Sequence, residues 1–584
     1  MNIIEIRNLS FTPIAREEKV LEHINLEIEQ GTINVVLGDS TSGNSILLKT
    51  LNSLIPNEIA GRMEGDVIVD GLNTKEHTLV EMATHCGIVL QNPELQVVSL
   101  TVGDDLAFGP ANLGLSSKEI QERVNFAAEA VRLKGFENRN PGTLSGGELQ
   151  SLAIGGILAM RPKVIAMLDP VAMLDPLGKS QVYSVIKDLR DKYGLTIVLS
   201  EAGMNIETSA EIADRVIVMD GGKIQFDGIP KEVFKHESVA SLGVPEVTQL
   251  FLKIRKSKPG FKNIEIPYTL KEASAQLREM LKDKKIEVPE KPSQLPDTNE
   301  RKEPIIKVRN LHHIFKVHPP VHALKGIDID IYRNEFVALI GQNGGGKTTF
   351  AYHLVGLLKA SNEDSSVIVD GVDAQKVSTK KLTEHINYVF QNPDNQFFSM
   401  TVYDEMTYGP KLNKWAEKDI QQSVNTALQY FGIEEFKDWY VVHLPRDVKT
   451  YVAEATIAAL NPQILVIDEP TGGLDIAGAL KMMQALKKLN ESGKTLIIIT
   501  HDQKIAAANC TRVVVMRKGK ILLDGHPKEV YSQYETLAQA NIKSPQITQL
   551  GQSLHDVGLP NDVLTVDEMY EIIAPYLPSR ISQV

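Results

Sequence analysis

The chain has 584 residues, more than one ordinary hydrophobic core accommodates, so its length predicts two to four domains. Its 42% hydrophobic and 23% charged residues are typical of a globular protein. The net charge of −12 argues against a broad footprint on a nucleic-acid backbone, although a local basic patch can hide in an acidic average.

Along both halves of the chain, short β-branched runs alternate with longer helical patterns. This alternation predicts an α/β fold of mainly parallel sheets with helices packed on them. The runs that we expect to form buried strands are, in chain order, residues 35–37, 164–166, 196–199, 337–340, 464–467 and 496–499. Residues 284–304, between the halves, contain four prolines and few apolar residues, and they predict an extended linker.

Neither the cysteines nor the hydropathy pattern indicates a secreted or membrane-spanning chain. Cys86 and Cys510 are too few for a disulfide framework and form no metal-site spacing, so we interpret them as buried or incidental thiols in a reducing compartment. The first residues lack the pattern of a signal peptide, and no run approaches the roughly 18 apolar residues of a membrane helix. If the protein acts at a membrane, we expect a partner to provide the membrane segment.

The second half of the chain repeats the first at an offset of about 300 residues. A Gln-Asn-Pro at 91–93 recurs at 391–393, and a Pro-x-x-Thr-Gln-Leu at 245–250 recurs at 545–550. Matches over most of both halves indicate duplication of a whole domain with its tail. The resulting division is a first domain at 1–230, its C-terminal extension at 231–283, the linker at 284–304, a second domain at 305–530 and its extension at 531–584.

In the second half, an expected strand runs into the sequence GQNGGGKTT at residues 341–349, which matches the phosphate-loop pattern GxxxxGK(S/T). Glycines let backbone N–H groups turn around phosphate oxygens, and a helix N-terminus adds positive potential. Lys347 would reach the β- and γ-phosphates, and the Thr348 hydroxyl would bind Mg²⁺. A glycine-rich turn without a ligand is disfavoured by the strand and helix on either side. The nucleotide-binding residues predicted by this match are Gly341, Asn343, Gly344, Gly346, Lys347, Thr348 and Thr349.

Two further strand ends carry candidate catalytic groups. The strand at 464–467 is followed by Asp468 and Glu469; the first carboxylate can hold Mg²⁺ through water, and the second can polarise the attacking water. His501 follows the next strand. Its place near these carboxylates favours a sensor of the γ-phosphate over a structural histidine.

These motifs, together with Gln391 and the Asp-Glu-Pro-Thr…Leu-Asp run, resemble the ABC ATPase family over nearly the whole chain. The resemblance implies two tandem copies of the P-loop NTPase fold, each with a small helical signature subdomain and a short C-terminal extension. It implies ATP and Mg²⁺ as ligands, with Gln391 at the metal and in catalysis. It also implies that two such domains pair head to tail, so that each ATP lies between the phosphate loop of one and an LSGGQ-like signature of the other.

The first half contains such a signature at residues 144–150, LSGGELQ. Ser145, Gly146, Gly147 and Glu148 would face the ATP held by the second half, with hydroxyl and backbone donors directed at its γ-phosphate. A glycine-rich helix start without this role is the alternative. The counterpart in the second half, residues 444–448, has lost both glycines and has a proline at its helix start.

The first half departs from the family at its own phosphate loop and strand ends. Asn44 replaces the lysine, and Leu168 and Asp169 stand where the second half has Asp468 and Glu469. Ala202 falls opposite His501, and Pro13 opposite Phe315, which could stack on adenine as the family's aromatic residue does or could belong to the core. The residues of this degenerate site are Gly38, Ser40, Gly43, Asn44, Ser45 and Gln91.

On the head-to-tail arrangement, every intact part falls in one composite site, and nearly every lost part falls in the other. Random decay would scatter the defects over both sites. The sequence therefore predicts one working site, one dead site and an obligate pairing of the two halves.

Three features resemble the ATPases of energy-coupling-factor importers, which take up vitamins and transition-metal ions. They are the Gln-Asn-Pro segments, the Thr-Val-x-Asp runs that lead to Gly-Pro, and the Pro-x-x-Thr-Gln-Leu tails. The resemblance implies a transmembrane energy-coupling protein, whose coupling helix docks beside the Gln loop, and a substrate-binding membrane subunit that sets specificity. It also implies a peripheral position on the cytoplasmic face of the cell membrane.

The competing class is a soluble tandem ABC ATPase that acts on ribosomes or nucleic acid. The acidic net charge, the lack of a basic interdomain segment and the asymmetric sites argue against it, so we expect no nucleic-acid partner. A non-catalytic regulatory role is disfavoured because one site keeps every catalytic part.

Overall fold

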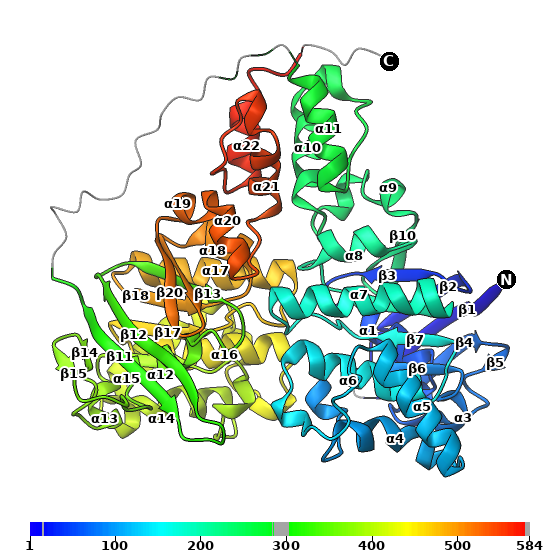
Figure 1. The fold of residues 1–584 in the computed structure, drawn as a ribbon, viewed down its shortest axis with the longest axis horizontal. Helices are drawn as coiled ribbons and strands as arrows, with labels where there is room; N and C mark the ends of the chain where they lie inside the picture. Colours follow the sequence, from blue (N-terminus) through cyan, green and yellow to red (C-terminus); the bar gives the residue numbers. More distant parts are fainter. Residues whose placement is uncertain (15–16, 283, 285, 287–302, 579–584) are drawn as a thin grey trace. The chain divides into compact units, whose positions relative to one another are not determined.

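The computed structural model describes residues 1–14, 17–282, 284, 286 and 303–578 (Figure 1). These residues form two compact units, here called unit 1 (Met1–Met280 with Asp475–Ala477 and Pro578) and unit 2 (Leu281–Leu474 and Gly478–Leu577). Most of the expected linker at 284–304 lies outside the described residues. The finer domain boundaries stay predictions.

Unit 1 contains one antiparallel and one mainly parallel sheet. The four-stranded sheet has the order β2-β1-β4-β5 and consists of β1 (Asn2–Pro13), β2 (Leu21–Glu29), β4 (Gly61–Val69) and β5 (Leu72–Asn73). The six-stranded sheet has the order β10-β9-β3-β8-β7-β6, and only β10 runs antiparallel to its neighbour. Its strands are β3 (Ile33–Leu37), β6 (Cys86–Val89), β7 (Val164–Met167), β8 (Thr196–Glu201), β9 (Arg215–Asp220) and β10 (Lys223–Gly228).

The helices of unit 1 cover the parallel sheet and form a small subdomain in which α4, α5 and α6 pack on one another. They are α1 (Asn44–Thr50), α2 (Leu54–Asn57), α3 (Leu79–Met82), α4 (Val102–Asn112), α5 (Ser117–Ala130), α6 (Gly146–Ala159), α7 (Pro176–Tyr193), α8 (Ile206–Ile212), α9 (Pro230–Val233), α10 (Glu246–Ser257) and α11 (Leu270–Met280). Within the described residues, no helix of either unit is long and apolar enough to cross a membrane.

Unit 2 repeats this architecture with sheet orders β12-β11-β14-β15 and β16-β17-β18-β13-β19-β20. Its strands are β11 (Ile306–Phe315), β12 (Val321–Ile331), β13 (Phe336–Gly341), β14 (Ser366–Val369), β15 (Val372–Asp373), β16 (Ile386–Val389), β17 (Ile464–Asp468), β18 (Thr495–Ile499), β19 (Arg512–Arg517) and β20 (Lys520–Gly525). Its helices are α12 (Lys347–Leu354), α13 (Thr379–Leu382), α14 (Val402–Leu412), α15 (Glu417–Phe431), α16 (Arg446–Ala459), α17 (Ile476–Glu491), α18 (Gln503–Asn509), α19 (Pro527–Ser532), α20 (Tyr534–Gln539), α21 (Gln546–Ser553) and α22 (Val566–Ile573).

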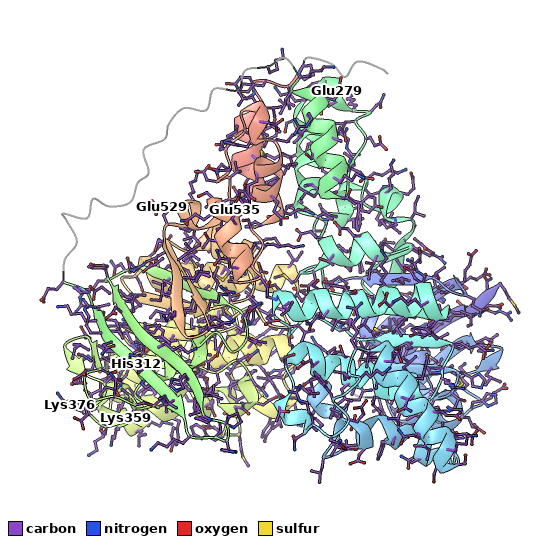
Figure 2. The ribbon with its side chains drawn as sticks, viewed as in Figure 1. Glu279, His312, Lys359, Lys376, Glu529 and Glu535 are labelled. Carbon is purple, nitrogen blue, oxygen red and sulfur yellow. The ribbon has the colours of Figure 1, made fainter. Side chains whose placement is uncertain are left out.

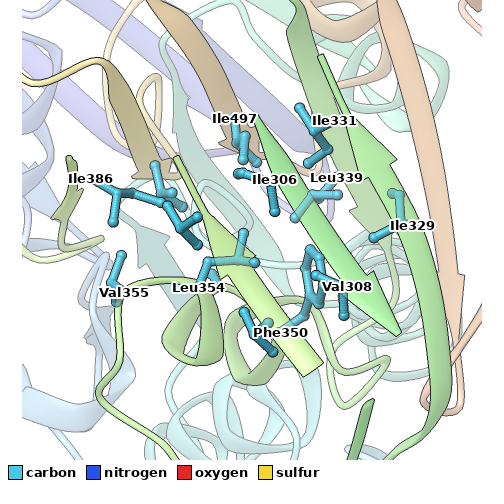
Figure 3. Packing of buried hydrophobic residues seen from close by; sticks show 14 of the residues in the cluster. Ile306, Val308, Ile329, Ile331, Leu339, Phe350, Leu354, Val355, Ile386 and Ile497 are labelled. Atoms are coloured by element: carbon cyan, nitrogen blue, oxygen red, sulfur yellow. The ribbon is translucent and has the colours of Figure 1, made fainter. Parts of the chain in front are cut away.

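The core of unit 2 lies between its two sheets and helix α12. Ile306 and Val308 of β11 belong to one buried cluster with Leu339 of β13, Phe350 of α12 and Ile497 of β18 (Figure 3). Strands β13, β17 and β18 are buried at every residue, which is why they read as continuous apolar runs in the sequence. The same packing fixes the position of the loop that joins β13 to α12.

All six predicted buried strands lie within observed parallel strands, β3, β7, β8, β13, β17 and β18. The antiparallel sheets were not predicted. In β1 the alternation of buried and exposed residues is broken, because the register with β2 shifts between Ile6 and Leu9 and Asn8 has a φ of 50°. Cys86 and Cys510 are both buried, as expected.

The C-terminal extensions are fastened in the same way in both units. In unit 1 the Thr248 hydroxyl donates to the Pro267 carbonyl at 2.7 Å, and the Gln249 amide donates to the Val244 carbonyl at 3.0 Å. In unit 2 the Gln549 amide donates to the Ser544 carbonyl at 2.7 Å. The repeated Thr-Gln-Leu tails are thus structural contacts that hold α10 and α21 to the loops before and after them.

Acidic side chains stabilise the helix starts at the junction between the second domain and its C-terminal extension. Glu529 and Glu535, both labelled in Figure 2, lie in the first turns of α19 and α20, where carboxylates interact favourably with the helix dipole. Glu529 also accepts the backbone N–H of His526 at 3.3 Å, which completes a capping box.

Candidate functional site

The phosphate loop of unit 2 connects β13 to α12. Gly346 precedes the helix with a φ of 103°, a left-handed conformation that costs glycine little, and an added Cβ would lie 2.8 Å from the Ala323 carbonyl oxygen. No side chain caps this helix start. Its backbone N–H groups therefore form the kind of terminus at which an anion binds.

The first two side chains of α12, Lys347 and Thr348, contact the phosphate loop and Asp468. Lys347 is 5% exposed, and its Nζ donates to the carbonyls of Gly341 and Gln342 at 2.8 and 3.0 Å. The Thr348 hydroxyl lies 3.4 Å from Asp468 Oδ2 and donates to it. Asn343 and Gly344 are exposed at the tip of the loop, and Thr349 is partly exposed in the first turn of the helix.

A residue that sequence reasoning missed, Tyr388, holds the Asp468 carboxylate. Tyr388 lies on β16, which pairs with β17, and its hydroxyl donates to Asp468 Oδ2 at 2.6 Å. Burial raises the pKa of Asp468 and, together with the Asp468 charge, that of Tyr388, so the phenol stays a proton donor. The sequence offered one signal for Tyr388: it is a hydroxyl-bearing residue in an otherwise apolar strand, three residues before Gln391.

The structure brings Glu469 and His501 together at the carboxyl ends of β17 and β18. Glu469 has a φ of 53°, and its backbone N–H donates to the Ile499 carbonyl at 2.8 Å. His501 Nε2 lies 3.3 Å from Glu469 Oε1, and the His501 backbone N–H donates to Oε2 at 3.3 Å. The two side chains are 13% and 12% exposed, so the pair is largely shielded from water. Because β13 pairs with β18 and β18 with β17, this pair lies at the same sheet edge as Lys347 and Asp468.

Two predicted residues lie apart from this cluster. Gln391 is exposed beyond β16, and among the described residues it makes no hydrogen bond to the cluster. Phe315 ends β11 with 38% exposure, and its ring contacts the edge of His313 at 4.5 Å between centroids. This exposure argues against the alternative that Phe315 is a core residue.

The phosphate loop of unit 1 keeps its shape but loses its charge. Gly43 has a φ of 87° and precedes α1, as Gly346 precedes α12. Asn44 Nδ2 donates to the Gly38 carbonyl at 3.2 Å, in place of the lysine contact. Asn44 Oδ1 accepts both the backbone N–H and the hydroxyl of Ser45, at 2.7 and 3.4 Å. The hydroxyl equivalent to that of Thr348 is thus turned toward Asn44, while Ser40 is exposed and Gln91 partly exposed.

Strand registers agree with the alignment of the degenerate strand ends. Val89 pairs with Met167 as Val389 pairs with Ile467, which places Leu168 at the position of Asp468. In addition, Asp169 has a φ of 40°, close to that of Glu469. Thr196 and Thr495 occupy equivalent ladder positions, so Ala202 corresponds to His501 as expected.

A second missed residue, Glu201, lies beside this degenerate site. It is 3% exposed at the end of β8, where unit 2 has Thr500. Burial, and then the negative charge of Asp169, raises the pKa of Glu201 to about 7. Unit 1 thus has a buried acid at the end of β8, one position before Ala202, the counterpart of His501.

The two signature helices start differently. Ser145 caps α6 in a capping box: its Oγ accepts the Glu148 N–H at 3.3 Å, and Glu148 Oε2 accepts the Ser145 N–H at 2.7 Å. Gly147 is needed for packing, because an added Cβ would lie 2.7 Å from Gly178 Cα. In unit 2, Pro445 precedes α16 without any side-chain cap, yet the helix forms. The altered segment has therefore kept its fold and lost its hydroxyl.

Comparison with known proteins gives consistent matches along the chain. A family model described as ABC transporter matches residues 21–172 and 324–472. An ABC transporter ATP-binding protein of Caldanaerobacter subterraneus subsp. tengcongensis is 35% identical over 577 residues, 97% of this chain and 98% of the relative. One of Methanosarcina mazei is 35% identical over 579 residues, 97% of this chain and 96% of the relative. Among solved structures, CbiO1 of Clostridium perfringens, described as part of the ABC transporter complex CbiONQ, is 37% identical and covers 43% of this chain and 100% of its own, with a TM-score of 0.38.

Proposed function

We propose that this chain, which belongs to the ABC transporter family as an ATP-binding protein with two tandem ATPase domains, hydrolyses ATP at one composite site. The predicted fold, two tandem P-loop NTPase domains, is confirmed, and so is the class of enzyme, an ATPase. Two points go beyond this: that residues of both units form the one working ATP site, and that its hydrolysis drives an importer.

The observation that carries the proposal is the clustering in unit 2. Lys347, Thr348, Asp468, Glu469 and His501 lie at one end of the parallel sheet, where the Thr348 hydroxyl is 3.4 Å from Asp468 and His501 Nε2 is 3.3 Å from Glu469 Oε1. The equivalent positions of unit 1 lack the cation, the first carboxylate and the histidine. Since unit 1 keeps the serine-capped signature helix, we infer that its residues 145–148 complete the ATP site of unit 2.

The donor set of unit 2 fits Mg²⁺. The Thr348 hydroxyl and the Asp468 carboxylate are the hard oxygen ligands that this ion prefers. Mg²⁺ would neutralise charge that develops on the β- and γ-phosphates. In this proposal Tyr388 fixes the carboxylate, Glu469 accepts a proton from the attacking water, His501 donates to the γ-phosphate, and Gln391 approaches the metal from its loop.

The composite site is tested by matched charge substitutions at the two signature helices. Gly146→Asp places a carboxylate at the start of α6, where like-charge repulsion with a γ-phosphate would oppose closure. Hydrolysis should fall by roughly 10²-fold or more, the scale of a lost oxyanion donor. ATP should still bind, because Lys347, Thr348 and Phe315 all belong to unit 2.

Arg446→Asp is the control, because Arg446 is the first residue of α16 and faces the degenerate site in this arrangement. It should leave hydrolysis close to that of the parent, with both variants shown to be folded by circular dichroism. Equal losses in the two variants, or no loss in Gly146→Asp, would overturn the composite site.

We further propose that the hydrolysis energises an importer of the energy-coupling-factor type, with a transmembrane coupling protein and a substrate-binding membrane subunit as partners. Large apolar side chains are exposed beyond the Gln loop of each unit, which is unusual for a surface that stays in water. In unit 1 they are Leu95, Val98, Leu100 and Phe108, and in unit 2 they are Phe398, Met400 and Tyr408. Phe398 and Tyr408 also stack edge to face, 4.4 Å apart. A hydrophobic coupling helix at the cytoplasmic membrane face suits such a surface.

The partner is tested by affinity purification of the tagged chain from cell membranes. We expect membrane-spanning proteins in the eluate and their loss in Phe398→Asp, whereas Leu357→Asp, at another exposed apolar residue, should retain them. Co-sedimentation with ribosomes in place of membrane proteins would favour the soluble tandem class instead.

A further inference from the structure

A cavity of about 500 Å³ lies in unit 2, between α15, the start of β17 and the end of α17. Its floor is apolar and includes Ala427 of α15, Leu465 of β17 and Leu489 of α17, all buried. Because β17 runs from Ile464 to Asp468, the cavity and the Asp468 carboxylate lie at opposite ends of the strand. The cavity is therefore separate from the ATP site.

The same corner of unit 1 is filled by large side chains. Phe126 contacts Tyr193 edge to face at 5.2 Å, and the Arg161 guanidinium lies over the Phe126 ring at 5.8 Å. Arg123 donates to the carbonyl of Ala159 at 3.3 Å.

Unit 2 has small polar residues at these positions. Ser423 replaces Arg123 and donates to the equivalent carbonyl, that of Ala459, at 2.6 Å, which fixes the alignment of the two corners. With the same offset, Thr426 replaces Phe126 and Asn461 replaces Arg161, and Ser492 stands before the helix-ending glycine in place of Tyr193. Unit 2 thus has small side chains at four positions where unit 1 has large ones, and the cavity lies beside them.

The new space is lined by groups that suit a ligand. Trp415 and Tyr430, both partly exposed, stand where unit 1 has Leu115 and Ala130, and they offer two aromatic faces. Lys494 stands where unit 1 has the apolar Leu195, immediately before the equivalent strand. Unit 2 therefore has two aromatic rings and a cation around the cavity, at positions where unit 1 has aliphatic residues.

Lys494 has no carboxylate partner among the residues that the structure describes. Its Nζ donates to the Asn461 carbonyl at 3.2 Å, and burial lowers its pKa. A half-buried cation that is bonded only to a neutral carbonyl can be stabilised further by an anion. Asp419, exposed at the rim, adds negative charge, which favours a monoanion over a polyphosphate.

We propose that this cavity binds a small organic monoanion with a flat apolar body, its carboxylate on Lys494 and its ring between Trp415 and Tyr430. The volume lies within the usual range for small-molecule sites, roughly 300–1,000 Å³. The site lies in unit 2 at the end of the sheet opposite the predicted nucleotide site, and it is independent of which membrane partner the chain serves.

The test uses 2-naphthoate as the probe and the full chain, followed by saturation-transfer NMR. We expect saturable binding with a dissociation constant of about 1 mM or tighter. The neutral isostere 2-naphthamide should bind roughly tenfold more weakly or worse, the scale of a lost charge-assisted hydrogen bond.

Two variants borrow the residues of unit 1, so they suit the local fold. Lys494→Leu removes the cation, and Thr426→Phe fills the space, and each should weaken 2-naphthoate binding roughly tenfold or more. Lys487→Leu, at an exposed lysine of α17 outside the cavity, should bind like the parent. Absence of saturable binding, equal binding of the amide, or retained binding in either cavity variant would overturn the proposal.

Discussion

Replacing Glu201 with glutamine should stabilise unit 1, and more so as the pH rises. The Glu201 carboxylate is buried, accepts the Asn205 N–H at 3.0 Å and lies 3.5 Å from the Tyr183 hydroxyl. Burial, and then the Asp169 charge, raises its pKa from 4.5 to about 7. The folded state therefore binds this proton more tightly than the unfolded state does.

The sign follows from that order of pKa values. Below about pH 4.5 the carboxyl is protonated in both states, so the raised pKa has no cost. Between about pH 4.5 and pH 7 the folded state must either keep a proton that the unfolded state has released or bury a charge, so stability falls over this range and levels off above about pH 7. The rise from 4.5 to about 7 corresponds to at most about 3 kcal/mol, at about 1.4 kcal/mol per tenfold change in proton affinity.

Glutamine keeps the shape of the side chain and does not titrate. The gain of Glu201→Gln over the parent should be below about 1 kcal/mol at pH 5 and about 3 kcal/mol at pH 8, the latter roughly 6 °C or more in the Tm of unit 1. Differential scanning calorimetry of the full chain at both pH values measures it, with Glu122→Gln, an exposed acid of α5, as the control. A gain that is independent of pH, or that shrinks as the pH rises, would refute the reasoning.

Three further predictions concern the working site. Glu469→Gln should keep ATP binding and lower turnover by roughly 10²-fold or more, as expected for a lost general base; near-normal turnover contradicts that role. Tyr388→Phe should raise the Mg²⁺ concentration needed for half-maximal hydrolysis roughly tenfold or more, while ATP binding without Mg²⁺ is unchanged. An unaltered Mg²⁺ titration would argue that Tyr388 does not position Asp468. Lys347→Ala should abolish hydrolysis, and adding Asn44→Lys to that variant should not restore it, because Leu168 remains; residual turnover in Lys347→Ala speaks against a single working site.

The parts of the site that follow a local pattern could be predicted from the sequence. Lys347 and Thr348 belong to one contiguous sequence motif. Asp468 directly follows four apolar residues, which form an unbroken apolar run because every residue of β17 is buried. The degenerate positions could be aligned because strand registers are the same in both halves, as the ladders of β7 and β17 show.

Contacts between distant strands could not be predicted in this way. The bond from Tyr388 to Asp468 joins residues 80 apart and depends on the pairing of β16 with β17. Burial of Glu201 depends on helix α7, which supplies Tyr183 beside it. The cavity depends on residue differences at several positions that are far apart in the sequence. A smaller residue at any one of these positions does not by itself predict a cavity.

The pairing of Tyr388 with Asp468 also explains how unit 1 can lack both groups and keep its packing. Losing one partner of a buried hydrogen bond leaves the other unsatisfied, at a cost of about 1–3 kcal/mol, whereas replacing both by apolar groups is nearly neutral. In unit 1 both positions are apolar, with Ile88 for the tyrosine and Leu168 for the aspartate, and Leu168 is 6% exposed within the core. The two replacements therefore belong together: a buried phenol beside Leu168 would have no acceptor, whereas the apolar pair of unit 1 leaves no polar group unsatisfied.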